Sequence, residues 1–208
     1  MSTQTATTTA VTPAGVSHLV LNVRDIEVSH RFWTEIVGFQ QCAALEPGRL
    51  TMRFYRGGTA GHHHDLALAQ VVNPDSLGEP SNWSMAGQAS GLNHVAIQYP
   101  DRETWLRQVA HLQAMGVPFL QRGDHGMSHS VYIQDPDGHG IECLYDLPEE
   151  VWAGDVNAAM SPVPALSPPK PATRGELDEL SNAKRRKNRV APTTSRLIAI
   201  PTITWSAR

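Results

Sequence analysis

The sequence contains an internal repeat, and this repeat limits the folds that the chain can adopt. Residues 16–23 (VSHLVLNV) alternate polar and apolar side chains as a half-buried strand does, and residues 92–98 (LNHVAIQ) repeat the pattern. His18 and His94 occupy the same position in the two strands and are 76 residues apart. A helical pattern follows each strand, so the chain is predicted to consist of two copies of one structural unit.

Each copy of the repeat predicts a strand, a helix and three further strands. The first helical pattern ends at Gly38, and the second begins after the capping residue Asp101 and ends at Gly116. The strands that we expect are residues 16–23, 39–44, 50–55 and 63–71 in the first copy, and 92–98, 118–121, 128–134 and 140–145 in the second. The predicted fold class is therefore α+β, with two βαβββ modules. We expect them to pair edge to edge into one curved sheet around a central cup, with the helices outside.

The ends of the chain differ in composition from this repeat. Residues 1–15 are rich in Thr, Ser and Ala, and are predicted to be a disordered arm. The repeat itself predicts one domain over residues 16–146, with module one at 16–72 and module two at 91–146. Residues 147–208 form a C-terminal extension with a proline-dense stretch and a short basic run, which we interpret as a solvated tail.

Composition excludes several classes of protein. A net charge of −3 and a pI near 6.3 give no electrostatic case for binding nucleic acid or a membrane surface. The two cysteines, Cys42 and Cys143, are too few for a disulfide framework, and we expect both to be reduced core residues. No apolar run has the length of a signal peptide or a membrane span, so we expect a cytoplasmic protein.

Four side chains at related positions of the two copies predict a metal site in the cup. Glu142 lies 48 residues after His94, and the matching offset of 46 residues after His18 falls on His64. A single strand histidine is usually a core residue, but two in register with a glutamate in a strand interior favour a metal site, because an unpaired buried carboxylate is costly. Two imidazoles and one carboxylate leave open coordination positions and suit non-heme Fe(II).

The second copy also carries a long motif. Gly123-Asp124-His125, five residues, Val131-Tyr132, two residues, Asp135-Pro136-Asp137-Gly138, three residues and Glu142 together match the signature of extradiol ring-cleavage dioxygenases. Residues 63–68 and the two histidine strands also resemble segments of these enzymes. The resemblance covers residues 16–146 and implies one domain of the vicinal-oxygen-chelate superfamily. Asp135–Gly138 is by itself only a turn sequence, which any fold could use.

The resemblance implies an enzyme that opens a catechol-type ring beside its diol and incorporates both atoms of O2, giving a ring-opened semialdehyde acid. It implies Fe(II) as the metal, with Mn(II) as the alternative ion, no organic cofactor, and a homo-oligomeric assembly. The residues that it implies are the metal ligands His18, His94 and Glu142, the proton-transfer residue His64, and the groups His125 and Tyr132 that hydrogen-bond the catecholate oxygens.

Two points and two alternatives stay open at this stage. The choice of His64 over His63 rests on the resemblance, because strand alternation does not settle it. The better-known extradiol enzymes have four βαβββ units, and this chain has two, so its substrate could be a monocyclic catechol or a larger diol. The first alternative is a glyoxalase-like isomerase or lyase in which His64 is a fourth ligand. The second is a metal-free protein that sequesters a small molecule.

Overall fold

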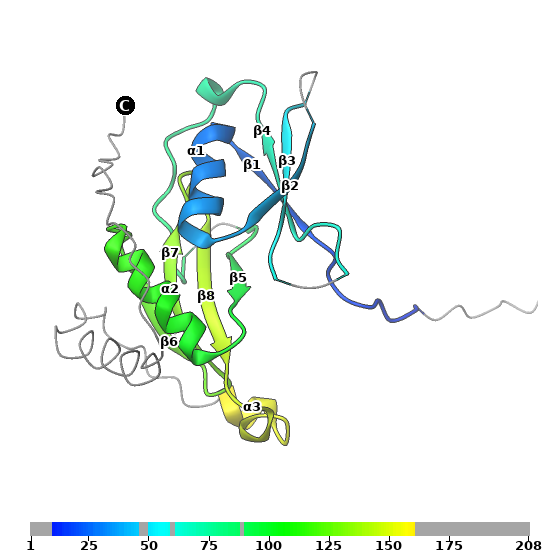
Figure 1. The fold of residues 1–208 in the computed structure, drawn as a ribbon, viewed down its shortest axis with the longest axis vertical. Helices are drawn as coiled ribbons and strands as arrows, with labels where there is room; N and C mark the ends of the chain where they lie inside the picture. Colours follow the sequence, from blue (N-terminus) through cyan, green and yellow to red (C-terminus); the bar gives the residue numbers. More distant parts are fainter. Residues whose placement is uncertain (1–9, 46–49, 59–60, 88–89, 161–208) are drawn as a thin grey trace, which may run out of the picture. The chain divides into compact units, whose positions relative to one another are not determined.

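The computed structural model describes residues 10–45, 50–58, 61–87 and 90–160. Two βαβββ modules follow one another along the chain (Figure 1). The elements of the first module are β1 (Leu19–Val23), α1 (Ile26–Arg31) with the π-helical segment η1 (Phe32–Val37), β2 (Gln40–Leu45), β3 (Met52–Arg56) and β4 (Leu66–Gln70). Those of the second are β5 (His94–Gln98), α2 (Arg102–Ala114), β6 (Gln121–Asp124), β7 (Ser128–Gln134) and β8 (Gly140–Asp146). The short helices η2 (Pro74–Ser76), η3 (Glu149–Val151) and α3 (Val156–Met160) lie outside the modules.

Each module forms a four-stranded mixed sheet, and the two sheets have the same topology. The strand orders are β1-β4-β3-β2 and β5-β8-β7-β6. In both sheets the first strand runs parallel to the last strand of its module, and the other neighbours are antiparallel. The predicted α+β class and the two βαβββ modules are confirmed.

The first helix ends where the sequence indicates. The Asp25 carboxylate caps it by accepting from the backbone N–H groups of Glu27 and Val28. Gly38 ends it with φ = 99°, a left-handed conformation that glycine adopts without the steric cost of a Cβ. On β1, Leu21 and Val23 are buried and Val20 is exposed, which confirms the predicted alternation.

The two modules pack through their helices, and the described residues show no edge-to-edge pairing between the sheets. The backbone carbonyl groups of residues 35–37, at the end of η1, accept hydrogen bonds of 2.7–2.8 Å from Tyr99, Gln108 and His111. The last carbonyls of a helix have no partner within it, so donors from the second module satisfy them. We expected the two sheets to pair into one cup within the chain. In the described residues the modules meet through these helix contacts instead.

The turn at Asp135–Gly138 also joins the modules. The Asp137 carboxylate accepts from the Arg24 backbone N–H at 2.9 Å and from the Ser29 hydroxyl at 3.0 Å. Burial raises the pKa of Asp137, and its hydrogen bond from Arg24 opposes that rise. The turn therefore has a role that its composition alone does not reveal, because it anchors the start of α1 to the second module.

Local differences from the expected elements occur in both modules. In the second module, the strand expected at residues 118–121 is β6 at Gln121–Asp124. Cys143 is buried as expected, whereas Cys42 is exposed, because it lies on the edge strand β2, which is exposed along its length. The strands expected to begin at residues 16 and 63 begin at Leu19 and Leu66, which are register partners. The segments that lead into β1 and β4 therefore lie at the same end of two neighbouring strands.

Part of the chain lies outside the described residues, including the proline-dense and basic segments within residues 161–208. The described helices are all too short or too polar to cross a lipid bilayer.

Candidate active site

A buried carboxylate lies at the centre of the second sheet. Glu142 is on β8, between β5 and β7, and is 6% exposed. The register places Tyr132 of β7 directly beside it, and the Tyr132 hydroxyl donates to Glu142 Oε1 at 2.7 Å. His94, the first residue of β5, places its Nε2 atom 3.1 Å from Glu142 Oε2. Burial and the neighbouring carboxylate raise the pKa of Tyr132, so its hydroxyl keeps its proton and acts as a donor.

The orientation of the His94 ring follows from its neighbour Asn93. The Asn93 amide N–H donates to the Met85 carbonyl at 3.1 Å, so the amide oxygen faces His94 Nδ1 at 2.8 Å. That oxygen can only accept, and His94 must therefore donate from Nδ1. The neutral ring then carries its lone pair on Nε2, which faces Glu142 Oε2. Two acceptors at 3.1 Å need a proton or a cation to hold them together, and this donor set is one that a divalent metal ion fits.

His125 reaches the other oxygen of the same carboxylate. Its Nε2 atom is 2.9 Å from the Tyr132 hydroxyl, 3.3 Å from Glu142 Oε1 and 3.2 Å from the Ser130 hydroxyl. Because the only Tyr132 proton goes to Glu142, the Tyr132 oxygen accepts from His125. Gly123 makes room for this ring, since a Cβ at that position would lie 2.5 Å from both His125 Nε2 and Ser130 Oγ.

Trp83 supports the second module from the linker between the two copies. Its indole ring stacks on Tyr132, with the ring centroids 5.2 Å apart and the planes 8° apart. Its N–H donates to the Asn93 carbonyl at 2.7 Å, so it contacts both neighbours of the site. Gly140 is required beside it, because a Cβ there would come within 2.1 Å of the indole nitrogen. Trp83 lies in a linker that is rich in Pro, Gly and Ser, so the sequence signal for its role is weak.

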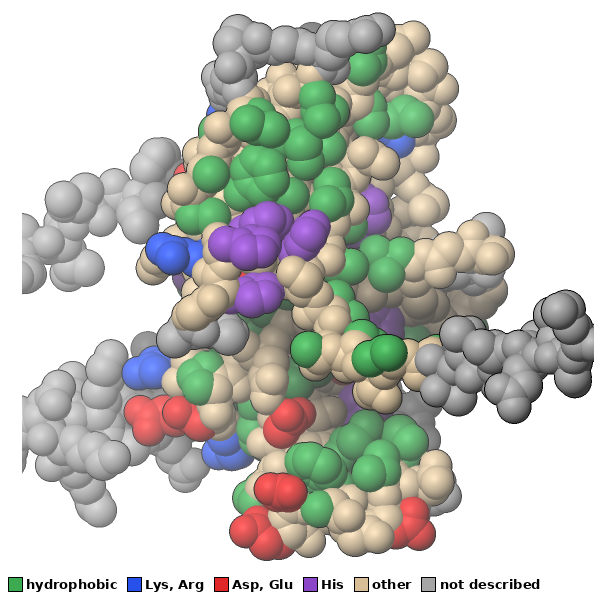
Figure 2. All heavy atoms as spheres, turned by 90° about the vertical axis from the view of Figure 1, so that its right-hand side faces the viewer, with side chains coloured by type: hydrophobic (Ala, Val, Ile, Leu, Met, Phe, Trp, Pro, Cys, Tyr) green, Lys and Arg blue, Asp and Glu red, His purple; other side chains and the backbone are tan. Residues whose placement is uncertain are grey.

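Histidines of the first module form a second group. The His18 ring is 4.4 Å from the His64 ring and 6.2 Å from the His63 ring, measured between centroids. The nearest ring nitrogens of His63 and His64 are 2.6 Å apart. Figure 2 shows histidine side chains gathered beside a hydrophobic area on this face of the molecule. His63 is exposed and His64 is half-buried, so His64 is the better enclosed of the two.

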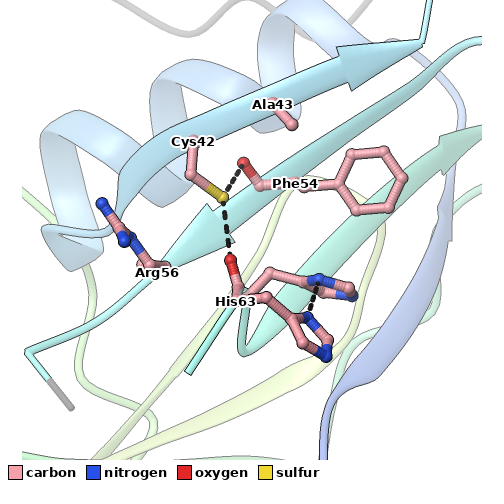
Figure 3. Close-up of a pocket in the computed structure, with 6 residues that line it drawn as sticks. Cys42, Ala43, Phe54, Arg56 and His63 are labelled. Atoms are coloured by element: carbon pink, nitrogen blue, oxygen red, sulfur yellow. Dashed lines mark hydrogen bonds between the residues drawn. The ribbon is translucent and has the colours of Figure 1, made fainter. Parts of the chain in front are cut away.

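A hollow of about 440 Å³ adjoins this group of histidines (Figure 3). Phe54 of β3 contributes one wall, with its ring 5.1 Å from the His64 ring. Partial desolvation lowers the pKa of His64, and the neighbouring imidazoles add to the effect, so the neutral ring is favoured. The lining residues are Cys42, Ala43, Phe54, Arg56, His63 and His64.

The predicted site residues thus fall into two groups. His94, Glu142, His125 and Tyr132 lie in mutual contact in the second module, whereas His18 lies with His64 in the first. Among the described residues, no three His, Cys, Asp or Glu side chains gather closely enough to hold a metal ion. Sequence reasoning missed Asn93 and Ser130. For Asn93 a signal existed, because Ser17 occupies the corresponding position before His18 and its hydroxyl lies 3.3 Å from His18 Nδ1.

Comparisons with known proteins identify relatives of different activities. The family described as "Glyoxalase/Bleomycin resistance protein/Dioxygenase superfamily" matches residues 15–143. A catechol-2,3-dioxygenase of Bacillus subtilis is 31% identical over 141 residues, which are 67% of this chain and 44% of that protein. A lactoylglutathione lyase of Pseudomonas aeruginosa is 25% identical over 144 residues, covering 62% of this chain and 80% of the lyase.

The solved structures agree with the fold. A glyoxylase/bleomycin resistance protein/dioxygenase domain from Frankia sp. EAN1pec superposes with a TM-score of 0.53 at 18% identity, over 65% of this chain and 100% of that domain. This likeness concerns the fold alone, and the chain spans less than half the length of the Bacillus dioxygenase. Since the family match extends over both modules and more than half of the sequence, the chain belongs to the glyoxalase/bleomycin resistance protein/dioxygenase superfamily.

Proposed function

We propose that this protein is an Fe(II)-dependent extradiol dioxygenase that opens the ring of a catechol-type diol with O2. The observation that carries the proposal is that two donor groups, on Tyr132 and His125, lie together beside one carboxylate oxygen. The Tyr132 hydroxyl and the His125 ring nitrogen lie 2.7 and 3.3 Å from the same oxygen of Glu142. Donors fixed in this way stabilise an anionic oxygen, which a bound catecholate provides. An isomerase with four protein ligands has no need of them.

His94 and Glu142 would hold the metal ion, with His18 as the third ligand. Their donor atoms, an imidazole lone pair and a carboxylate oxygen, belong to the 2-His-1-carboxylate set that suits Fe(II), and Mn(II) is the alternative ion. When bound, Fe(II) brings the diol and dioxygen side by side at one centre and lets electrons pass between them. Asn93 keeps the His94 lone pair directed at that centre through its 2.8 Å contact with Nδ1.

The remaining residues would handle protons and charge. Once the Glu142 carboxylate turns to a metal ion, the Tyr132 hydroxyl no longer donates to it and can donate to a substrate oxygen, with the His125 N–H beside it as a second donor. His64 would take the proton that a catechol hydroxyl loses on binding, because its lowered pKa keeps the ring neutral. Tyr132 keeps its proton over the physiological range because its pKa is raised by burial and by Glu142.

His18 would come to this site from a second copy of the chain. Within one copy the modules contact through η1 and α2, and His18 belongs to the group around His64. Strands β1 and β5 lie at sheet edges without a further partner in the described residues, and β2 is exposed along its length. A two-fold dimer that places β1 of one copy beside β5 of the other would bring His18 to His94 twice, as closed symmetry requires.

Mixing two inactive variants tests this arrangement. His18→Ala and Glu142→Ala each lack a ligand, but a mixed dimer has both substitutions in one site and an intact second site. After unfolding and refolding an equimolar mixture, we expect about a quarter of the wild-type activity, because about half of the dimers are mixed and each has one intact site. No recovery, in a mixture shown by mass spectrometry to contain mixed dimers, would mean that the three ligands come from one copy.

The activity itself is tested by loading the full chain with Fe(II) without oxygen and adding O2 to a panel of catechols. We expect oxygen uptake that matches the appearance of a yellow ring-opened product. A protein that binds Fe(II) and takes up no oxygen with any catechol would contradict the proposal. A protein that retains no metal at all would favour the metal-free binding function.

One observation favours a second candidate function, a glyoxalase-like lyase. The His64 ring is 4.4 Å from His18, which is close enough for both to bind one metal ion, and lactoylglutathione lyases are among the relatives. Such an enzyme would be active with Zn(II) or Ni(II) and would not consume oxygen. Measuring lactoylglutathione formation with each ion, beside oxygen uptake with Fe(II), separates the two functions.

A further inference from the structure

The hollow beside His64 has the size and lining of a small-molecule site. Its volume of about 440 Å³ lies within the range of pockets that enclose small ligands. It is lined by one aromatic ring, two imidazoles, a thiol and a single permanent cation, Arg56, and no acidic side chain of the described residues lines it. Figure 3 shows Phe54 and Arg56 on the strand that borders the histidines. The lining is therefore complementary to a ligand that has both an aromatic ring and a negative charge.

Strand alternation fixes Arg56 and Phe54 on the same face of the sheet. Both line the hollow, whereas Tyr55 between them is fully buried on the opposite face. Residues two apart in a strand are separated by about 6.6 Å, so a ring that lies on Phe54 can carry a substituent within reach of the Arg56 guanidinium. The Phe54 ring is in turn 5.1 Å from the His64 ring, so the aromatic group also lies beside the proposed base.

Arg56 differs from Arg24 and Arg53 of the same module in its charge partners. Arg24 pairs with Asp137, and Arg53 pairs with Glu27. No ion pair joins Arg56 to an acidic side chain of the described residues. The nearby Asp65 carboxylate accepts from the Gly57 backbone N–H at 2.8 Å and lies 2.9 Å from His62. The charge of Arg56 is thus free to bind an anion in the hollow.

The Cys42 side chain lines the hollow on the side of β2. Its thiol faces the Phe54 and His63 carbonyl oxygens, at 3.4 and 3.5 Å (Figure 3). The thiol is thus engaged by carbonyl groups of the chain, and among the described residues Arg56 is the one permanently charged side chain in the lining. Arg56 remains the group that decides which charge the hollow accepts.

We propose that Arg56 is a specificity-determining residue that binds a carboxylate substituent of the substrate, while the substrate ring packs on Phe54. This inference rests on the proposed function and narrows its substrate class to catechols that carry a carboxylate. The guanidinium offers two parallel N–H donors to a carboxylate, a geometry that a lysine cannot reproduce. The contact is remote from the diol, so it acts on selection among catechols and leaves the ring-opening step unchanged.

The test compares catechol and 4-methylcatechol, which are neutral, with 3,4-dihydroxybenzoate and 3,4-dihydroxyphenylacetate. The proteins are the Fe(II)-loaded full chain and its Arg56→Met, Arg56→Lys and Arg122→Met variants. Arg122 is the matched control because it is also an exposed strand arginine, and it lies on β6 of the other module. We expect wild-type kcat/KM to be at least about tenfold higher for one carboxylated catechol than for catechol.

The Arg56→Met variant should lose that preference. Its kcat/KM for the carboxylated catechol should fall roughly 10- to 100-fold, while the value for catechol stays within about twofold. Arg56→Lys should recover part of the loss, and Arg122→Met should resemble the wild type. Equal losses for neutral and carboxylated catechols, or a wild type that prefers the neutral ones, would overturn the inference and leave the dioxygenase function standing.

Anaerobic titration calorimetry gives a readout that does not depend on turnover. Binding of 3,4-dihydroxyphenylacetate should weaken roughly 10- to 100-fold in Arg56→Met and remain unchanged in Arg122→Met. If no catechol consumes oxygen, the proposed function fails, and this binding arm still decides whether Arg56 holds a carboxylate. An affinity that is the same in the wild type and in Arg56→Met would overturn the inference whatever the activity.

Discussion

The two modules share a topology but differ in what surrounds their first histidine. In both, the residue before the histidine contacts its Nδ1 atom, Ser17 at 3.3 Å from His18 and Asn93 at 2.8 Å from His94. Duplication has therefore reproduced the histidine together with its support. A hydrogen bond at Nδ1 leaves Nε2 available as a ligand, which is the role that we propose for both rings.

The modules differ in the groups that face these histidines. In the second module His94 lies beside the buried Glu142 carboxylate, which Tyr132 and His125 also contact, and β7 is mostly buried. In the first module His18 meets the imidazole of His64 beside an open hollow, and β2 is exposed along its length. One copy of the unit thus supplies a charged, packed half of the site, and the other supplies the space for a substrate. Substitutions at matched positions can test this division.

The largest effect is expected from Glu142→Gln in the second module. Glutamine keeps an oxygen that can accept from Tyr132, so the fold should remain, but the anionic ligand is lost. Metal affinity should fall by more than the 10- to 100-fold that loss of a supporting residue typically costs, and turnover should fall to background. Metal content by mass spectrometry and oxygen uptake measure the two effects. Glu27→Gln, an exposed change in the first module, is the control, and unchanged iron content in Glu142→Gln would contradict the ligand role.

His64→Phe tests the corresponding position of the first module. If His64 transfers protons, the variant should keep its metal ion and lose roughly 10²- to 10⁴-fold in kcat, the usual contribution of general acid–base catalysis. His63→Phe is the matched control and should lose much less, because His63 is exposed and its ring is farther from His18. Loss of the metal ion from His64→Phe would instead favour the four-ligand lyase.

Glycine substitutions compare the packing of the two halves. At Gly123 a new Cβ would lie 2.5 Å from His125 Nε2, so Gly123→Ala should displace that ring from Tyr132 and destabilise the fold by about 1–3 kcal/mol. At Gly57 in the first module the nearest atoms would be 3.6 Å away, an ordinary contact, and Gly57→Ala should change stability by less than about 0.5 kcal/mol. Urea unfolding measures both. Equal effects would mean that the second half is no more tightly packed than the first.

The smallest expected effect is a pH dependence of stability at the turn that joins the modules. His139 Nδ1 lies 2.9 Å from Asp135, and this hydrogen bond raises the pKa of His139 above its usual value. The folded protein then holds that proton more tightly than the unfolded chain. Its stabilising contribution is complete below the unfolded pKa of about 6.5 and is lost as pH rises through the raised pKa.

Unfolding free energies at about pH 5.5 and about pH 8.5 measure this contribution. The difference in unfolding free energy between the wild type and His139→Gln should be larger at the lower pH, by roughly 1 kcal/mol or less. His62→Gln, which removes a similar contact with Asp65 in the first module, is the comparison for a pair outside the joining turn. A difference of the opposite sign would show that the turn does not hold a protonated histidine.

Much of the fold followed from the sequence because its signals are local. Strand alternation, the cap at Asp101, and the glycines at 38 and 116 each act within a few residues, and the structure confirms them. The contact between Glu142 and Tyr132 was not predicted and follows from the register of β7 and β8, which are adjacent antiparallel strands. The contacts of Trp83 with Asn93 and Tyr132 did not follow in this way, because these partners lie ten or more residues away.

The sequence by itself determined the duplicated unit, the positions of its histidines and the carboxylate that faces one of them. Only the tertiary structure decided how the two units meet: through donors on Tyr99, Gln108 and His111 that satisfy the free carbonyls at the end of η1, and through Asp137 at the start of α1. A repeat specifies the interior of each unit through short-range periodicity. It leaves the contact between units to side chains far apart in the chain, whose pairing depends on which buried polar groups still need a partner.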